Sequence, residues 1–271
     1  TVTGPFTSLT GWQSDPVIVL TIGSLIITGG LGFPVIVELT GHHRGNRLSL
    51  HTRLVLQVTG ILLLGGTLAV LGLELSNPHS LKSLTWAGKL LGAIFQSITP
   101  RTAGFNTLDI GNLRDGTLFV MIILMLIGAS PSSTGGGIKT TTFGVLIASV
   151  ISTARGRDDV EMHERRLPHD EILKAMTIAT LAMGLVTGVT LILSVTENAR
   201  FLEVLFETAS AFGTVGLTMG ITPNLSDIGR ALIMATMFMG RVGPLTVVIA
   251  LAQRKRKPST VHLAEERILI G

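Results

Sequence analysis

Two four-residue segments carry threonine and glycine at matching positions, and their chemistry suits a metal cation. They are Thr102-Ala103-Gly104-Phe105 and Thr214-Val215-Gly216-Leu217. Glycine at the third position permits an extended backbone whose carbonyl oxygens face a path instead of pairing with one another. The threonine hydroxyl adds another oxygen, and a helix ending just before the segment directs its partly negative end to the same point. The two segments therefore indicate a place where a cation binds or passes.

These segments belong to an internal repeat. A shift of 112 residues also aligns Asn112-Leu113 with Asn224-Leu225, Asp115 with Asp227, Met125 with Met237 and Gly128 with Gly240. Each copy is predicted to contain a membrane helix, a half-length helix, the Thr/Gly turn and a second membrane helix with Asp115 or Asp227 as its N-cap. A single copy would equally fit a glycine turn between two packed helices, but the repetition favours an ion site.

A glycine-rich stretch, Gly128 to Thr140, contains Gly-Gly-Gly-Ile-Lys-Thr and invites comparison with a phosphate-binding loop. That motif needs glycine directly before the lysine and a strand before the loop. Ile138 occupies the glycine position, and an apolar helical run precedes the loop, so nucleotide binding is disfavoured. Pro131 and three glycines instead predict a helix broken inside the membrane, with Ser132, Ser133 and Thr134 satisfying the freed backbone. A static kink is the alternative.

Lys139 and Arg241 are the two basic residues inside the long apolar runs. Ionisable residues at membrane depth are functional candidates by default, and snorkelling to the membrane edge is the alternative. Arg241 lies near the middle of its run, so we expect it to face the glycine-rich loop or the pore. Lys139 fits either interpretation.

The elements that position these residues are apolar runs. About 20 uncharged residues in a helix cross a bilayer core. Five segments reach this length, counting two that contain only Lys139 or Arg241: Pro16–Val37, Leu54–Leu73, Gly116–Ala154, Ala175–Thr196 and Ala231–Gln253. Two shorter runs, Trp86–Thr99 and Phe201–Phe212, suit re-entrant half-helices. The sequence predicts an all-α polytopic membrane protein with five crossing segments and two re-entrant pore helices.

Composition excludes several functional classes. Charged residues make up 14% of the chain and hydrophobic residues 46%, so a water-soluble enzyme is not expected. The absence of cysteine excludes disulfides, thiolate nucleophiles and cysteine-based zinc sites. Nucleic acid is not an expected partner, because the basic clusters flank membrane ends and alternate with acids between Asp158 and Glu171.

The distribution of positive charge predicts the orientation. Thirteen lysines and arginines flank one side of the predicted membrane segments, including Arg44, Arg47 and the cluster Arg254–Lys257, and six flank the other. The positive-inside rule places the richer side, and with it the C-terminus, in the cytoplasm. The half-helices then lie toward the outer side of a plasma or inner membrane.

Three motifs carry a family resemblance. Arg101–Asn106, Gly128–Thr140 and Gly240–Thr246 together resemble the TrkH/KtrB superfamily of potassium transporters, and the KtrB branch most. The resemblance implies four helix–pore-loop–helix repeats around one path, each giving one filter strand. The implied filter residues are Thr102, Ala103, Gly104, Phe105, Thr214, Val215, Gly216 and Leu217, with K⁺ held at Thr102, Ala103, Gly104, Thr214, Val215 and Gly216. The implied gate residues are Ser132, Thr134, Gly135, Gly136, Gly137, Lys139 and Arg241.

The resemblance also implies a domain organisation and partners. Residues 1–46 would hold the last helix of repeat two and a cytoplasmic link. Residues 47–168 would form repeat three with the intramembrane loop 129–138, residues 169–257 repeat four, and residues 258–271 a cytoplasmic tail, with repeat one and most of repeat two missing upstream. The implied partners are the lipid bilayer, a second copy in a homodimer, and a cytoplasmic nucleotide-binding ring of the KtrA or TrkA type. No cofactor is expected.

The expected function is a pore-forming, non-enzymatic subunit of a potassium uptake system. Possible Na⁺ transport or symport stays open. The alternative is a non-conducting fragment or a structural membrane subunit of a cation transport complex. A membrane subunit of an ATP-driven pump lacks support, because we find neither a phosphorylated aspartate motif nor a nucleotide loop. The basic tail has a second interpretation, as a segment that binds anionic lipid.

Overall fold

The computed structural model describes residues 8–41, 48–157, 159–163, 165–244 and 246, and these are mainly helical. The helices are α1 (Pro16–Leu31), α2 (Phe33–Thr40), α3 (Leu50–Glu74), α4 (Trp86–Ile98), α5 (Asp115–Leu126), α6 (Thr140–Ala154), α7 (His169–Thr196), α8 (Phe201–Gly213) and α9 (Asp227–Val242). Short 3-10 helices cover Thr10–Trp12, Ile110–Asn112 and Thr222–Asn224. A two-stranded antiparallel hairpin, β1 (Glu161–Met162) and β2 (Arg165–Arg166), lies between α6 and α7.

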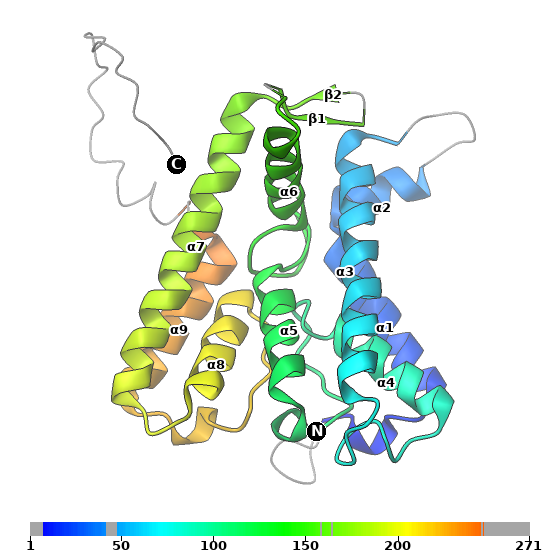
Figure 1. The fold of residues 1–271 in the computed structure, drawn as a ribbon, viewed down its shortest axis with the longest axis vertical. Coiled ribbons are helices and arrows are strands. Elements are labelled where there is room, and N and C mark those ends of the chain that lie inside the picture. The colour runs from blue at the N-terminus through cyan, green and yellow to red at the C-terminus, as the bar shows by residue number, and fades with distance from the viewer. Residues whose placement is uncertain (1–7, 42–47, 158, 164, 245, 247–271) are drawn as a thin grey trace.

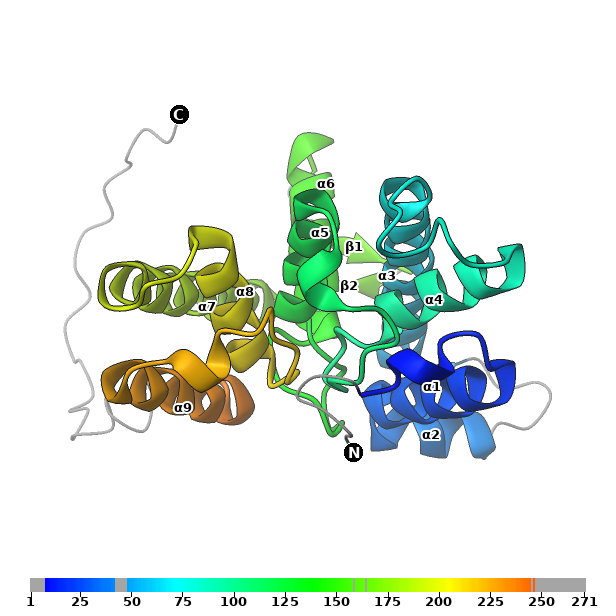
Figure 2. The same cartoon turned by 90° about the horizontal axis from the view of Figure 1, so that it is seen from below.

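The helices form two groups around a central column. Helices α1 to α4 lie on one side, α7 to α9 on the other, and α5 and α6 stand between them, one above the other (Figures 1 and 2). The half-length helices α4 and α8 lie at the same end of the molecule, and the hairpin lies at the opposite end (Figure 1). This arrangement brings the C-terminal ends of α4 and α8 toward the central column.

Two described helices, α3 and α7, are long and apolar enough to cross a membrane. They contain 25 and 28 residues, so each is at least about 37 Å long at 1.5 Å per residue. The bent pair α1 and α2 would raise the number of spans to three. Helices α5 and α6 are shorter apolar helices, so the expected number of five crossings is not confirmed.

The expectation of one continuous helix over Pro16–Val37 was wrong. Asp15 caps α1 and Pro16 opens it, but the helix ends at Leu31 and α2 leaves at an angle of 102°. Gly32 makes the corner with a φ of 89°, and a Cβ there would overlap the carbonyl oxygen of Pro131. Pro34 lacks the N–H needed to continue the α1 ladder.

The ends of the other helices show smaller differences. The helix over Gly116–Ala154 is interrupted between α5 and α6, where the glycine-rich stretch lies. Ser226, not Asp227, caps α9, and Asp115 is the first residue of α5 behind Arg114. Gly243, with a φ of 94°, follows the end of α9, so the apolar run from Ala231 does not continue as one helix. The rest of that run, residues 247–253, lies outside the described residues, as do Arg44, Arg47, the cluster Arg254–Lys257 and the tail 258–271.

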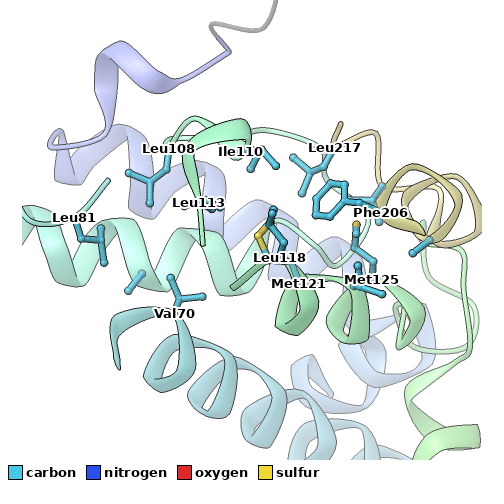
Figure 3. Close-up of a cluster of buried hydrophobic side chains, with 14 residues drawn as sticks. Val70, Leu81, Leu108, Ile110, Leu113, Leu118, Met121, Met125, Phe206 and Leu217 are labelled. Atoms are coloured by element: carbon cyan, nitrogen blue, oxygen red, sulfur yellow. The ribbon is translucent and has the colours of Figure 1, made fainter. Parts of the chain in front are cut away.

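The half-helices begin at the expected residues, Trp86 and Phe201, and contain 13 residues each. An apolar cluster packs them against α5 and the end of α3. Its labelled members in Figure 3 are Val70, Leu81, Leu108, Ile110, Leu113, Leu118, Met121, Met125, Phe206 and Leu217. Van der Waals packing of these side chains holds the half-helices against α5, and it therefore also positions the turns that follow them.

Candidate ion-conduction site

The two Thr/Gly segments lie against each other. We call Thr102–Phe105, after α4, the first turn and Thr214–Leu217, after α8, the second turn. A Cβ added at Gly104 would overlap the carbonyl oxygen of Val215, and one added at Gly216 would lie 3.9 Å from the Cα of Gly104. Segments 112 residues apart in sequence therefore lie in direct contact.

The backbone has the same unusual form in both turns. The φ angles are 69° and 78° at Thr102 and Gly104, and 52° and 90° at Thr214 and Gly216. Glycine adopts this region freely, but a positive φ is a genuine outlier for a β-branched residue such as threonine. Strain of this kind persists only where surrounding contacts enforce it, and it concentrates at functional sites.

The first turn is closed mainly by Thr99. Its backbone carbonyl accepts a hydrogen bond from the N–H of Ala103 at 3.2 Å, and its hydroxyl donates to the carbonyl of Phe105. Arg101 extends behind the turn, where it is 6% exposed and donates from Nη2 to Thr59 Oγ1 at 3.4 Å. Its Nε has no hydrogen-bond partner in the described part of the chain.

The second turn is closed by the last turn of α8. The carbonyl of Ser210 accepts from the N–H of Val215 at 2.8 Å, and its hydroxyl accepts from the N–H of Gly216 at 3.2 Å. Thr214 Oγ1 is buried and has no hydrogen-bond partner among the described residues. An oxygen left unpaired in a buried site is costly unless another group satisfies it, so this hydroxyl suits an ion ligand.

The glycine-rich loop, residues 129–138, lies directly against both turns. A Cβ at Gly135 would come within 2.5 Å of Thr102 Oγ1, and one at Gly136 within 2.5 Å of Thr214 Oγ1. Three consecutive glycines thus allow the loop to approach the two threonines more closely than any residue with a side chain would. The residues Gly135, Gly136 and Gly137 are buried, whereas Ser132 and Thr134 are exposed.

The base of this loop is closed by backbone pairing. The N–H of Gly128 donates to the carbonyl of Ile138 at 2.9 Å, and the N–H of Ile138 donates to Leu126 at 3.0 Å. The N–H of Thr140 donates to Ala129 at 3.3 Å, and its hydroxyl donates to Ser130 Oγ at 2.9 Å. Backbone groups at the end of α5 and just before α6 therefore form hydrogen bonds with each other.

The loop is also held from two sides. On one side the N–H groups of Ser130 and Thr134 donate to the carbonyls of Gly30 and Gly29, at 3.0 and 3.3 Å. On the other side the N–H of Gly137 donates to the carbonyl of Gly240 on α9 at 3.3 Å. The loop thus bridges the end of α1 and the end of α9.

Lys139 and Arg241 both donate to carbonyls of the loop. Lys139 Nζ lies 2.5 Å from the carbonyl oxygen of Gly135, and Arg241 Nη1 donates to the carbonyl of Thr134. These contacts place both basic groups on the loop, as expected for Arg241.

A cavity of about 370 Å³ opens beside the turns. It is lined by Gly104, Phe105, Asp109, Gly216 and Leu217, among others. A second cavity of about 430 Å³ also includes Asp109 in its lining. The turns therefore contact the loop through their threonines and border open space at their glycines.

Sequence reasoning missed the residues that support the second turn. Glu207 is 5% exposed on α8 and contacts Thr218 and Thr222 after the turn. The available signal was an acid three residues before Ser210 in an apolar half-helix, which places both on one helix face. Arg101 was considered only for orientation and as part of a motif.

Comparison with known proteins supports one family. The TrkH family model, described as a cation transport protein, matches residues 3–262. The Ktr system potassium uptake protein B of Bacillus subtilis is 42% identical over 266 residues, which cover 97% of this chain and 59% of that protein. The potassium/sodium uptake protein NtpJ of Enterococcus hirae is 36% identical, with 97% of this chain and 59% of that protein covered.

A solved structure has the same fold. The crystal structure of the potassium transporter TrkH from Vibrio parahaemolyticus superposes with a TM-score of 0.72, at 18% identity, over 90% of this chain and 54% of that one. The chain therefore spans little more than half the length of these proteins. The family is one of transport proteins, in agreement with the expectation that the chain is not an enzyme. Because the family model matches nearly the whole chain and the Ktr protein is 42% identical to it, the chain belongs to the TrkH family of cation transport proteins.

Proposed function

We propose that this chain is part of the ion-conducting pore of a potassium uptake system in the cell membrane. The observation that carries the proposal is the pair of turns with matching strained backbones, brought together at the ends of two half-length helices. Backbone carbonyls and threonine hydroxyls replace the hydration shell of K⁺. The proposed K⁺ ligands come from Thr102, Ala103, Gly104, Thr214, Val215 and Gly216, with Phe105 and Leu217 completing the two filter strands.

The complete pore needs more than the two turns of this chain. The chain covers 59% of the Bacillus subtilis relative, and we propose that two further repeats supply the other half of the filter. In this interpretation residues 47–168 and 169–257 are repeats three and four. Repeats one and two, of which residues 1–46 contain the end, would complete the ring of four repeats. A non-conducting fragment remains the alternative for the chain alone.

The glycine-rich loop is the proposed gate. It presses against the threonines of both turns and is held by α1 on one side and by Arg241 and Gly240 on the other. While it occupies this place, it fills the space through which an ion leaving the turns would pass. Ser132, Thr134, Gly135, Gly136, Gly137 and Lys139 move with it, and the guanidinium of Arg241 holds the closed form and opposes cations by its charge.

The proposed assembly follows the family. The Bacillus subtilis relative is named as part of a Ktr system, and we propose a homodimer regulated by a cytoplasmic nucleotide-binding ring, with the C-terminus on the cytoplasmic side. Na⁺ is a further candidate ion, since the Enterococcus hirae relative is named for potassium and sodium.

Complementation tests the proposal. Expressed alone in a host that lacks potassium uptake, the 271-residue chain should not restore growth at limiting K⁺, whereas a four-repeat transporter that carries it should. Half a ring of oxygens cannot replace a hydration shell. Membrane levels of both proteins serve as the control. Robust growth with the chain alone would contradict the four-repeat pore, and failure of the four-repeat form at normal levels would contradict K⁺ transport.

A further inference from the structure

An acidic side chain lies in the interior behind the second turn. Glu207, in the middle of α8, is 5% exposed. A buried carboxylate is unfavourable unless hydrogen bonds compensate for the lost water. Both of its oxygens have such a partner: Thr218 Oγ1 donates to Oε2 at 2.7 Å, and Thr222 Oγ1 donates to Oε1 at 2.5 Å.

Both donors belong to the segment that leaves the second turn. Thr218 directly follows Leu217, and its hydroxyl also accepts from the N–H of Gly220 at 3.0 Å. Thr222 opens the 3-10 helix Thr222–Asn224, which leads to the start of α9. Glu207 therefore connects α8, which precedes the second turn, with the segment that follows the turn.

Ser210 provides the matching attachment inside the turn. It lies three residues after Glu207, so the two side chains share one face of α8. Its hydroxyl accepts from the N–H of Gly216, as described above, at 3.2 Å. One face of α8 therefore holds the second turn and the residue after it by two hydrogen bonds, one between Ser210 and Gly216 and one between Glu207 and Thr218.

The first turn has no counterpart of this acid. Phe95 occupies the position that aligns with Glu207 and is fully buried. There the hydroxyl of Thr99 closes the turn onto the carbonyl of Phe105. Since the same backbone form is reached without a carboxylate, the fold does not require one, and Glu207 has a role particular to the second turn.

We propose that Glu207 is a positioning residue for ion selectivity, which holds the second turn at the spacing that suits K⁺ by fixing Thr218 and Thr222. The inference rests on the proposed K⁺ path through Gly216. Glu207 does not touch the ion; it acts through two hydroxyls and the backbone between them. Discrimination between K⁺ and Na⁺ depends on the positions and number of the coordinating oxygens, so loosening this segment should affect the choice of ion before it affects folding.

The test uses Glu207→Gln and Thr218→Val in a four-repeat transporter that carries this chain. The measurement is K⁺ uptake in the presence of increasing Na⁺, at equal amounts of membrane protein. Each variant should lower the preference for K⁺ over Na⁺ about tenfold, on the scale of one lost hydrogen bond to a charged group. The double variant should lose less than the sum of the two single losses, because both changes break the bond between Thr218 and Glu207.

Glu203→Gln is the matched control. It removes the same charge from the same helix, but Glu203 pairs with Arg200 outside the network. Its preference should remain at the level of the unmodified transporter. An equal loss in Glu203→Gln would overturn the inference in favour of a general effect of charge on α8.

Gly216→Ser separates the inference from the proposed function. If Gly216→Ser changes the ion preference while Glu207→Gln and Thr218→Val do not, the positioning role is wrong and the K⁺ path stands. If Gly216→Ser also leaves the preference unchanged, the path itself is wrong. Should Glu207→Gln fail to reach the membrane, Thr218→Val decides, since valine keeps the shape of threonine and removes only the hydroxyl.

Discussion

The first and second turns share a backbone but differ in what supports it. Thr102 and Gly104 have nearly the same φ angles as Thr214 and Gly216. Behind the first turn lie the hydroxyl of Thr99 and a buried cation, Arg101; behind the second lie the hydroxyl of Ser210 and a buried acid, Glu207. The two repeats thus have the same turn backbone, but different side chains support it.

The two turns also differ in the space around their glycines. Gly104 lies so close to the carbonyl of Val215 that no Cβ fits, whereas a Cβ at Gly216 would meet only the Cα of Gly104, at 3.9 Å. The two glycines look equivalent in the sequence, but different structural constraints require glycine at each position. At Gly216 the reason is conformation alone, and at Gly104 it is conformation and close packing.

The largest expected effect separates these two glycines. Gly104→Ser in a four-repeat transporter should reduce K⁺ uptake at least about a hundredfold, because a backbone clash is added to strain of about 1–2 kcal/mol at positive φ. Gly216→Ser should raise the K⁺ concentration needed for growth about tenfold and weaken discrimination against Na⁺, from the strain alone. Uptake kinetics with Na⁺ competition measure both.

Gly184→Ala on α7 is the control for this pair, since a Cβ there would meet nothing within 4 Å. It should transport normally. Equal losses of K⁺ uptake in Gly104→Ser and Gly216→Ser would show that the difference in packing does not matter. Unchanged Na⁺ competition in both variants would mean that the two segments are ordinary turns without a role in ion binding.

A second difference between the repeats is the residue after the aligned glycines Gly128 and Gly240, which is Ala129 in one and Arg241 in the other. Arg241→Ala, or a shortened glycine-rich loop, should each increase K⁺ flux at saturating K⁺ about tenfold, because each removes a hydrogen bond that holds the proposed closed gate. The double change should add little. Transport at the unmodified rate in both, or simple addition of their effects, would place the gate elsewhere.

The smallest effect concerns the two hydroxyls. Thr99→Val removes a bond to a carbonyl, and Ser210→Ala removes a bond from the N–H of Gly216. Each neutral hydrogen bond contributes about 0.5–1.5 kcal/mol, so we expect a rise of about two- to tenfold in the apparent KM for K⁺ in either variant. Similar KM values in the two variants would mean that both turns contribute equally to K⁺ binding. A shift confined to one variant would identify the turn that dominates binding.

Local patterns in the sequence predicted much of the backbone geometry around the candidate site. The starts of the half-helices at Trp86 and Phe201, the two turns and the interruption around Pro131 all depend on short-range features, such as apolar runs, glycine and proline. The contact of Arg241 with the glycine-rich loop was also expected, because a charge inside an apolar run must find a polar partner near its own depth.

Features that depend on distant parts of the chain could not be predicted in this way. The corner at Gly32 follows from its close approach to Pro131, a hundred residues later, and Pro16–Val37 carries no charge to mark it. The link from Glu207 to Thr218 depends on which face of α8 is buried. Asp115 and Asp227 looked like N-caps, but each lies one residue inside its helix.

The paired base of the glycine-rich loop has a thermodynamic consequence. Ile127 and Ile138 form a parallel bridge, and the bonds at Gly128 and Thr140 tie the two ends of the loop together. The conformational entropy of bringing these ends together has therefore been lost whether or not the loop rests against the turns. A swing of the loop as one hinged flap then needs little reordering of the chain. The equilibrium of the proposed gate would then depend mainly on the few bonds at Gly29, Gly30, Thr134 and Gly240, so small changes at either neighbouring helix would shift it.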